Sequence, residues 1–597
     1  MSHLVYLNRY FLKYRWRLLL GVLFIFISNY FQALQPQMIR QALDMVIENI
    51  ALYRLYDGFA LQQHVFSHFG TTLLYFGIVV LVLALLMGAF LYLVRQTIIV
   101  MSRLIEYDLR KELFAHYEGL HLAFYKKNKT GDLMARIVED VSKVRMYLGP
   151  AVLYGINLFS LFTLVIYSML KVSWELTLYS LAPLPVLSVS IYYVSSLIHK
   201  HSEKIQVQLS KLTSISQEVF SGIRVVKSYV QEVPMGAYFK EESQSYMDKS
   251  LKLARVDSLF HPTMLLLIGL STIITVYAGG IQVAKGTVTT GNIAEFIIYV
   301  NMLTWPVTSL GWISSLIQQA SASQKRINEF LGTKPEIVNG VAGSQNGAFK
   351  GRVTFDHVHF TYPDTGIRAL DGVHFDLLPG QKLAIIGRTG SGKSTIADLL
   401  VRMYDVTQGR ILLDGEDIRQ QDLSLLRRRI GYVPQDVFLF SDSVTNNVRF
   451  GKPDAAQTEV ENYTAFAAIH REIAELPNGY ETLVGERGVT LSGGQKQRVS
   501  IARALIKQPD VLVLDDCLSA VDTNTEKQIL GYLRDTIADK TAIIITHRIY
   551  SLLEFDKIIV LEEGRIAEEG THEELLAQKG YYYEQFEKQR MEEELER

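Results

Sequence analysis

Six long apolar stretches occupy the first half of the chain and predict membrane-spanning helices. None of the six contains Asp, Glu, Lys, Arg or His, and each is about as long as a helix that crosses a bilayer. The stretches are residues 18–39, 71–94, 146–170, 176–198, 262–284 and 296–324. Buried helices of large soluble proteins rarely run this far without a charge, so the pattern favours six membrane spans.

The distribution of Lys and Arg predicts which side of the membrane each connection faces. The N-terminus and the two long connections, after the second and fourth stretches, are basic, whereas the alternate connections carry few basic residues, among them Arg54, Lys171 and Lys285. Because basic connections stay on the cytoplasmic side, we expect the N-terminus, both long connections and the C-terminal half to be cytoplasmic.

The two long connections predict helices that continue beyond the membrane and then break. Helical spacing of apolar residues continues over 95–120, and breakpoints follow near 126–131 and near 221–222. We expect short helices near 124–127 and 221–226 to dock onto the cytoplasmic half. Residues 1–17 predict a short amphipathic helix at the membrane interface.

The pattern changes after a segment rich in Gly, Asn and Ser, residues 332–350, which reads as a linker. Beyond it, short strands, tight turns and helices alternate, as is typical of α/β domains. The expected organisation is a transmembrane domain over 1–331, the linker over 332–350, and an α/β domain over 351–597.

Composition agrees with this division and excludes several classes of protein. The 597 residues exceed what one core organises, and the net charge of -1 does not indicate a nucleic-acid partner. The one cysteine, Cys517, excludes an internal disulfide framework. Mean hydropathy of +0.14 is high for a soluble enzyme.

A phosphate-binding loop lies early in the α/β half, between an apolar strand and a helical pattern. Its residues are Gly387, Arg388, Thr389, Gly390, Ser391, Gly392, Lys393, Ser394 and Thr395. The glycines let backbone N–H groups wrap phosphates at a helix N-terminus. Lys393 is expected at the β and γ phosphates of ATP, Ser394 on Mg²⁺, and Thr395 on a phosphate oxygen.

A second apolar strand, 511–514, ends in Asp515. Placed beside the loop, this carboxylate is expected to hold Mg²⁺ directly or through water. The pair of motifs predicts an ATP and Mg²⁺ site of the P-loop NTPase type.

Between these motifs stands Leu491-Ser492-Gly493-Gly494-Gln495, and with it the chain resembles ATP-binding cassette proteins of the exporter branch. Val484-Gly485-Glu486-Arg487-Gly488 resembles the exporter loop that contacts the membrane domain. The resemblance covers almost the whole chain. It implies an α-helical six-span transmembrane domain followed by an α/β cassette.

The resemblance also assigns roles to single residues. Tyr362 resembles the aromatic residue that stacks on adenine, with core packing as its alternative, and Gln435 resembles the glutamine on Mg²⁺ that senses the membrane domain. Asp522 resembles the loop that signals across a dimer, and His547 the switch histidine near the γ-phosphate. Ser492, Gly493, Gly494 and Gln495 resemble the signature that completes a partner's ATP site.

One position departs from the family pattern. Asp516 stands where the family usually has the Glu that polarises the attacking water. Its carboxylate is one methylene shorter, which can cost roughly 100-fold in rate when geometry is limiting. This substitution resembles the slow-site subunit of heterodimeric multidrug exporters, and harmless drift is the alternative.

The resulting expectation is a half-transporter of the cell membrane that exports lipophilic or amphipathic small molecules across it and pairs with a second, different subunit carrying the Glu. Nearly charge-free spans favour a lipophilic substrate over ions or sugars. Aromatic and polar residues of the sixth stretch are cavity candidates, with lipid packing as an equal account: Tyr299, Asn301, Trp305, Trp312 and Gln318. Alternatives are a lipid flippase, possibly homodimeric, and an ATP-gated regulatory membrane protein without transport.

Overall fold

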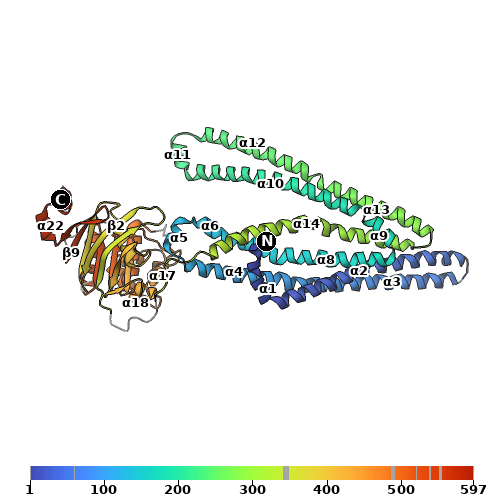
Figure 1. Ribbon diagram of the computed structural model, residues 1–597, viewed down its shortest axis with the longest axis horizontal. Coiled ribbons are helices and arrows are strands. Elements are labelled where there is room, and N and C mark those ends of the chain that lie inside the picture. The colour runs from blue at the N-terminus through green and yellow to red at the C-terminus, as the bar shows by residue number, and fades with distance from the viewer. Residues whose placement is uncertain are drawn as a thin grey trace. The chain divides into compact units, whose positions relative to one another are not determined.

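The computed structural model describes residues 2–59, 61–340, 349–485, 491–519, 521–536, 539–549 and 554–595. It divides the chain into two compact units, Met1–Tyr117 with Gly131–Thr333, and Glu118–Thr130 with Lys334–Arg597. The first unit is helical and the second holds both β-sheets (Figure 1). Three residues of the predicted exporter loop, Glu486, Arg487 and Gly488, and residues 341–348 of the predicted linker lie outside the described residues.

The first unit is built from long helices joined by short turns. Its elements are η1 (Ser2–Leu7), α1 (Asn8–Lys13), α2 (Arg15–Leu55), α3 (Leu61–Val94), η2 (Arg95–Ile99), α4 (Val100–Glu118), α6 (Thr130–Ala135), η3 (Arg136–Asp140), α7 (Val141–Met146), η4 (Tyr147–Ala151), α8 (Val152–Val172), α9 (Trp174–Leu181), α10 (Pro183–Ser221), α11 (Ile223–Ser228), α12 (Glu232–Asp257), α13 (Phe260–Ala284) and α14 (Thr290–Leu331). η2, η3 and η4 are single π-helical turns within longer helices. The predicted continuation of the spans as long helices is therefore present.

Among the described residues, five helical stretches are long and apolar enough to cross a membrane. They are Arg15–Leu55, Gln62–Glu118, Thr130–Val172, Glu232–Ala284 and Thr290–Leu331. The remaining predicted stretch, 176–198, is divided between α9 and α10 at Ala182, directly before Pro183. The apolar part of α10 falls short of the ~20 residues of a full span, because charged residues follow at once. The count of six stays a prediction.

The core of the first unit lies where α8, α9, α13 and α14 pack together. Val165, Met169, Leu176 and Phe296 are fully buried in it. Tyr299 is also fully buried, and its hydroxyl donates to the carbonyl of Ala33 at 3.0 Å. The expectation that Tyr299 lines a cavity is therefore wrong for this structure, since the residue joins α14 to α2.

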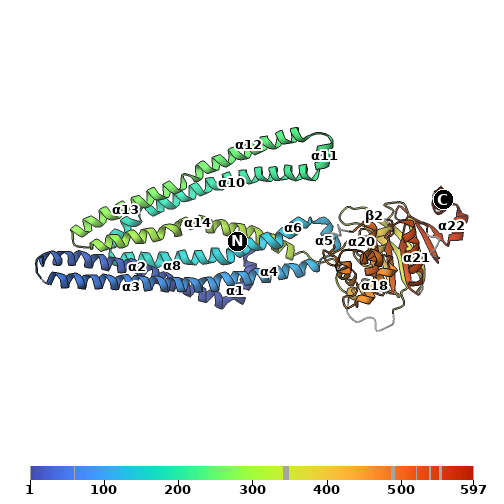
Figure 2. The ribbon, with the colours of Figure 1, turned by 180° about the vertical axis from the view of Figure 1, so that it is seen from behind.

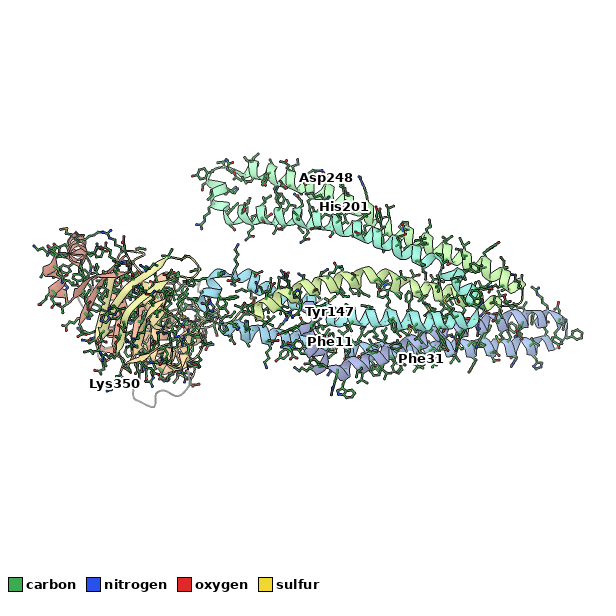
Figure 3. The ribbon with its side chains drawn as sticks, in the orientation of Figure 1. Phe11, Phe31, Tyr147, His201, Asp248 and Lys350 are labelled. Carbon is green, nitrogen blue, oxygen red and sulfur yellow. The ribbon has the colours of Figure 1, made fainter. Side chains whose placement is uncertain are left out.

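α10 and α12 form an antiparallel pair that turns at α11. His201 on α10 and Asp248 on α12 mark the pair, and Phe31 and Tyr147 mark the α2 and η4 region of the same unit (Figure 3). Among the apolar side chains of α11, Ile223 and Val225 are exposed. Docking of this second breakpoint onto a cassette stays a prediction.

The N-terminus forms the short helix expected, and polar contacts hold it against α4. Tyr10 donates to Glu112 at 2.7 Å, Arg9 pairs with the same carboxylate, and Lys13 reaches Asp108 at 2.6 Å. α1 and α4 are thus fixed to each other by two carboxylates.

The second unit contains two sheets and a set of short helices. Its strands are β1 (Val353–Thr361), β2 (Arg368–Leu377), β3 (Lys382–Gly387), β4 (Gln408–Leu413), β5 (Glu416–Asp417), β6 (Ile430–Val433), β7 (Val511–Asp515), β8 (Thr541–Ile545), β9 (Lys557–Glu562) and β10 (Arg565–Gly570). The strand orders are β2-β1-β4-β5, antiparallel, and β10-β9-β3-β8-β7-β6, parallel except for β10.

Helices cover the six-stranded sheet, and α18, α20 and α21 are seen beside it in Figure 2. The helices of the second unit are α5 (Leu122–Lys127), α15 (Lys393–Leu400), α16 (Leu423–Arg429), α17 (Val444–Arg449), α18 (Gln457–Phe466), α19 (His470–Ala474), η5 (Gly479–Glu481), α20 (Gly493–Leu505), α21 (Thr523–Thr536), α22 (His572–Gln578) and α23 (Tyr581–Leu595). The central strands β3, β7 and β8 are buried on both faces, as parallel strands between helices are.

The first predicted breakpoint docks as a short helix on the second unit. α5 belongs to that unit, and Ala123 is part of its buried core. The ammonium of Lys126 lies 5.1 Å from the ring centre of Tyr362 and 5.3 Å from that of Tyr404. The prediction for residues 124–127 is therefore confirmed.

Candidate nucleotide site

The phosphate-binding loop joins β3 to α15, as the sequence predicts. Gly387 and Gly392 have φ of +153° and +98°. A Cβ on Gly387 would lie 2.2 Å from the carbonyl oxygen of Leu561, and one on Gly392 would lie 2.3 Å from that of Ala369. Neither position has room for a side chain, so the close turn requires glycine.

The loop wraps around the side chain of Lys393. Its ammonium donates to the carbonyl oxygens of Gly387 and Arg388, both at 2.8 Å, and burial lowers its pKa. Ser391 Oγ is buried without a hydrogen-bond partner. A buried cation and an unpaired hydroxyl within one loop fit the charge and the acceptor atoms of a phosphate chain.

Two adjacent aspartates stand at the carboxyl end of β7. Asp515 is 2% exposed, and its Oδ1 has no hydrogen-bond partner. Burial raises the pKa of Asp515 to about 6, and the charges of Asp398 and Asp516 act in the same direction. A hydrogen bond from Ser394 acts in the opposite direction. The carboxylate of Asp515 and the hydroxyl of Ser394 are neighbouring oxygen donors, and Oδ1 of Asp515 is unpaired, so these two side chains fit Mg²⁺.

Asp516 adopts a left-handed backbone conformation, with φ of +44°. Its N–H donates to the carbonyl of Ile545 at 2.9 Å, and its carbonyl accepts from Ser519 Oγ at 3.0 Å. Burial raises its pKa, although the charge of His547 opposes the shift. The residue is fixed between the ends of two parallel strands.

His547 follows β8 by two residues and faces the same group of charges. Burial and the charge of Lys393 lower its pKa, whereas Asp516 favours its protonated form. The structure thus places Lys393, Asp516 and His547 in one electrostatic neighbourhood.

Gln435 and Tyr362 belong to elements next to the group formed by Lys393, Asp516 and His547. Parallel pairing of Val433 with Leu514 places Gln435, two residues farther along, at the same sheet edge as Asp515. Gln435 is exposed. The hydroxyl of Tyr362 bonds Thr395 Oγ1 at 2.9 Å, so the hydroxyl expected at a phosphate is bonded to tyrosine.

The signature residues are not brought to the chain's own loop. Ser492 caps α20, its N–H bonds the side chain of Gln495 at 2.9 Å, and Gln495 Nε2 donates to Glu472 at 2.9 Å. Within the described residues, these contacts stay in the helical part of the unit. Asp522 likewise caps α21, accepting from the N–H of Thr525 at 3.0 Å.

Sequence reasoning did not assign three side chains that the structure places at the site. Lys126 lies over Tyr362, Asp398 accepts from Tyr432 at 3.2 Å and raises the pKa of Asp515, and Arg548 pairs with Glu526. Asp398 could have been identified from the sequence, because it lies on the helix that follows the phosphate-binding loop. Lys126 had none, because its partners are distant in sequence.

Comparisons with known proteins agree over both units. A family profile described as "ABC transporter transmembrane region" matches residues 18–307, and one described as "ABC transporter" matches residues 370–519. A solved structure described as a bacterial Atm1-family ABC exporter with ATP bound matches with a TM-score of 0.77 and 28% identity. The match covers 96% of this chain and 98% of that one.

Relatives of similar length carry transporter names. The probable multidrug resistance ABC transporter ATP-binding/permease protein YheI of Bacillus subtilis is 40% identical over 82% of this chain and 84% of its own. The multidrug resistance-like ATP-binding protein MdlA of Escherichia coli is 38% identical, covering 81% and 82%. An ATP-dependent lipid A-core flippase of Pseudomonas fluorescens is 36% identical, covering 80% and 79%.

The helical first unit, the α/β second unit and the loop chemistry confirm the fold class predicted from the sequence. The profile over 370–519 implies binding of ATP with Mg²⁺. The chain therefore belongs to the ABC transporter family, as a multi-pass membrane exporter driven by ATP hydrolysis.

Proposed function

We propose that this chain exports lipophilic or amphipathic small molecules as one subunit of a heterodimer in which its own phosphate loop forms the slow ATP site. It resides in the cell membrane, the plasma or inner membrane, with its N-terminus and cassette in the cytoplasm. The multidrug names of the relatives and the nearly charge-free spans support the substrate class.

The observation that carries the proposal is Asp516 beside an otherwise complete site. Lys393, Ser394 and Asp515 are retained, and only the group expected to polarise water is one methylene shorter. A site of this composition retains nucleotide affinity while its hydrolysis slows, because binding and proton transfer use different atoms.

In this proposal each side chain has one task. Lys393, Ser391 and the N–H groups of the loop hold the phosphates, while Ser394, Asp515 and Gln435 hold Mg²⁺. Bound Mg²⁺ offsets the negative charge of the phosphates. His547 donates near the γ-phosphate, Asp516 orients the attacking water, and Tyr362 stacks on adenine.

The signature acts on the other subunit. Ser492, Gly493, Gly494 and Gln495 open α20, and the N-terminus of a helix favours a phosphate. The described contact of Gln495 is with Glu472, outside the chain's own loop, and this supports a role of the signature at the partner's site. In this proposal, one catalytic cycle requires two cassettes.

The test compares ATP hydrolysis by this chain purified alone with hydrolysis by the co-expressed pair. Low activity alone and high activity in the pair are expected, with Asp516→Asn changing the pair only modestly. Removing the partner's catalytic Glu should nearly stop turnover. Robust hydrolysis by a homodimer, lost in Asp516→Asn, would make Asp516 an ordinary catalytic carboxylate and refute the asymmetric site.

A lipid flippase is the second candidate, favoured by the relative named for that activity. Purified protein in vesicles separates the two functions. ATP-dependent movement of a fluorescent lipid without uptake of lipophilic dyes into inverted vesicles supports the flippase.

A further inference from the structure

Two histidines and an aspartate gather on the four-stranded sheet, outside the nucleotide site. Asp356 and His357 lie on β1, and His374 lies on the neighbouring strand β2. One ligand atom from each lies within 4.8 Å of the other two. The side chains of His357 and His374 are 74% and 54% exposed, so solutes reach both rings directly.

A β-bulge brings the three side chains to one face of the sheet. The register of β1 and β2 shifts between Phe355, which pairs with Phe375, and Val358, which pairs with Val373. His357 lies in this shift with φ of +49°, uncommon for a residue with a Cβ. In a regular strand consecutive residues face opposite ways, so the bulge gives Asp356 and His357 the same solvent-facing side.

The cross-strand neighbours fix the orientation of the cluster. The rings of His357 and His374 stack with centres 4.8 Å apart and planes 30° apart. Arg410, opposite Asp356 on β4, donates Nε to Asp356 Oδ2 at 2.9 Å. Because this bond holds Oδ2, the other oxygen of the carboxylate, Oδ1, faces the imidazoles.

The two distances from Asp356 Oδ1 are close to the ligand spacing around a small tetrahedral ion. Asp356 Oδ1 lies 3.0 Å from Nδ1 of His357 and 3.8 Å from Nδ1 of His374. Ligands at about 2.0–2.2 Å from Zn²⁺ in tetrahedral geometry are roughly 3.3–3.5 Å apart. The two separations from Asp356 Oδ1 therefore need to change by about half an ångström or less, and the ligand atoms of the two imidazoles lie within 4.8 Å of each other.

We propose that Asp356, His357 and His374 form a surface site for a divalent transition-metal ion of the Zn²⁺ class. Two imidazoles and a carboxylate suit Zn²⁺, Ni²⁺ or Cu²⁺, whereas Mg²⁺ takes oxygen ligands. The site is thus chemically distinct from the nucleotide site. Three protein ligands leave the fourth position to water, and the bound ion ties β1 to β2.

Competition with a fluorescent chelator tests the site on untagged, nucleotide-free, full-length protein. Wild type is expected to bind one Zn²⁺ per chain through the cluster, and His357→Ala and His374→Phe should weaken that binding at least about tenfold. His374→Phe retains a stacked ring without a ligand nitrogen. His359→Ala is the matched control, because His359 lies on the same strand but bonds Asp371 at 2.9 Å.

Two further readouts distinguish ligation from folding. Electron paramagnetic resonance of bound Cu²⁺ should report two imidazole nitrogens in wild type and one in His374→Phe. Zn²⁺ should raise the unfolding temperature of wild type and His359→Ala but not of His374→Phe. Equal Zn²⁺ affinity and equal thermal shifts in all variants would overturn the proposal.

Discussion

Two neighbouring carboxylates at the end of β7 share one chain segment but have different surroundings. Asp515 is almost fully buried among Asp398, Asp516 and Ser394, while Asp516 turns into a left-handed conformation beside His547. A buried carboxylate near like charges is unfavourable when ionised. The nucleotide site therefore holds charge that destabilises the free protein.

Asp515→Asn should stabilise the nucleotide-free protein at pH 7.5. The pKa of Asp515 is about 6 in the folded state against 3.8 for a free side chain, so the folded state takes up the proton first as pH falls. Its ionised form lowers stability by something of the order of 3 kcal/mol above pH 6, and this penalty disappears as pH falls toward 4. Scanning calorimetry should show a higher unfolding temperature for the variant at pH 7.5, with the difference shrinking near pH 5.

Asp522→Asn provides the control for this experiment. The backbone N–H of Thr525 lowers the pKa of Asp522, so its ionised form stabilises the fold, and this contribution is lost as pH falls. The variant should not gain stability at pH 7.5. Equal unfolding temperatures for wild type and Asp515→Asn at every pH would contradict the assigned environment of Asp515.

Asp516→Glu should accelerate hydrolysis at this chain's own site. The added methylene moves the carboxylate toward the position that the family usually fills, which predicts a gain of roughly 10- to 100-fold. Single-turnover hydrolysis is measured in a pair whose other catalytic Glu has been removed, so that only this site reports. Asp516→Asn is the control and should not exceed the slow wild-type rate, whereas no gain in Asp516→Glu would mean that geometry elsewhere limits the site.

At the level of elements, the short helix α5 lies in the long connection that follows the second apolar stretch, and it contacts aromatic side chains of the cassette. Ala123 is buried in the core of the second unit, and Lys126 lies over the rings of Tyr362 and Tyr404. A cation over aromatic faces contributes about 0.5–1 kcal/mol when partly exposed. Lys126 therefore joins α5 to Tyr362, the residue proposed to stack on adenine.

Lys126→Met should reduce the stimulation of ATP hydrolysis by transported substrate about two- to fivefold, because it removes the charge that attaches α5 to the two rings. Basal hydrolysis should change less. Lys127→Met is the matched control, since the adjacent ammonium has no described ring contact. Equal stimulation in both variants, measured in vesicles with a lipophilic substrate, would exclude this role for Lys126.

The sequence predicts those features of the fold and of the site that depend on residues close together in the chain. The loop 387–395 is one contiguous motif with its strand and helix, and the break that precedes α5 is visible in the residues themselves. The roles expected for Tyr362, Gln435 and His547 came instead from the family resemblance. The division of α9 from α10 and the burial of Tyr299 were not predicted. Apolar composition does not distinguish a lipid-facing helix from a packed one, and the partners of Tyr299 lie on a distant helix.

For the whole molecule, the phosphate loop and the signature make separate sets of contacts, which supports the proposed dimer with shared ATP sites. The loop wraps around Lys393, whereas Ser492 bonds Gln495, and Gln495 donates to Glu472. Under the proposed function, one chain contributes half of each of two ATP sites. Substitutions in the two motifs should have separable effects in the assembled pair.

Ser492→Arg should abolish turnover at the partner's site while leaving nucleotide bound at this chain's loop. The added side chain fills the space at the N-terminus of α20, where a phosphate of the partner's ATP is expected, and replaces the cap of that helix. Lys393→Ala should do the reverse, removing photolabelling of this chain by an ATP analogue because the phosphates lose their counter-charge. Labelling and steady-state hydrolysis are measured on the same preparations, with Ser492→Thr as the control that keeps the capping hydroxyl. If Ser492→Arg removed labelling of its own chain and spared turnover of the pair, the signature would act within its own subunit, and the shared-site arrangement would be wrong.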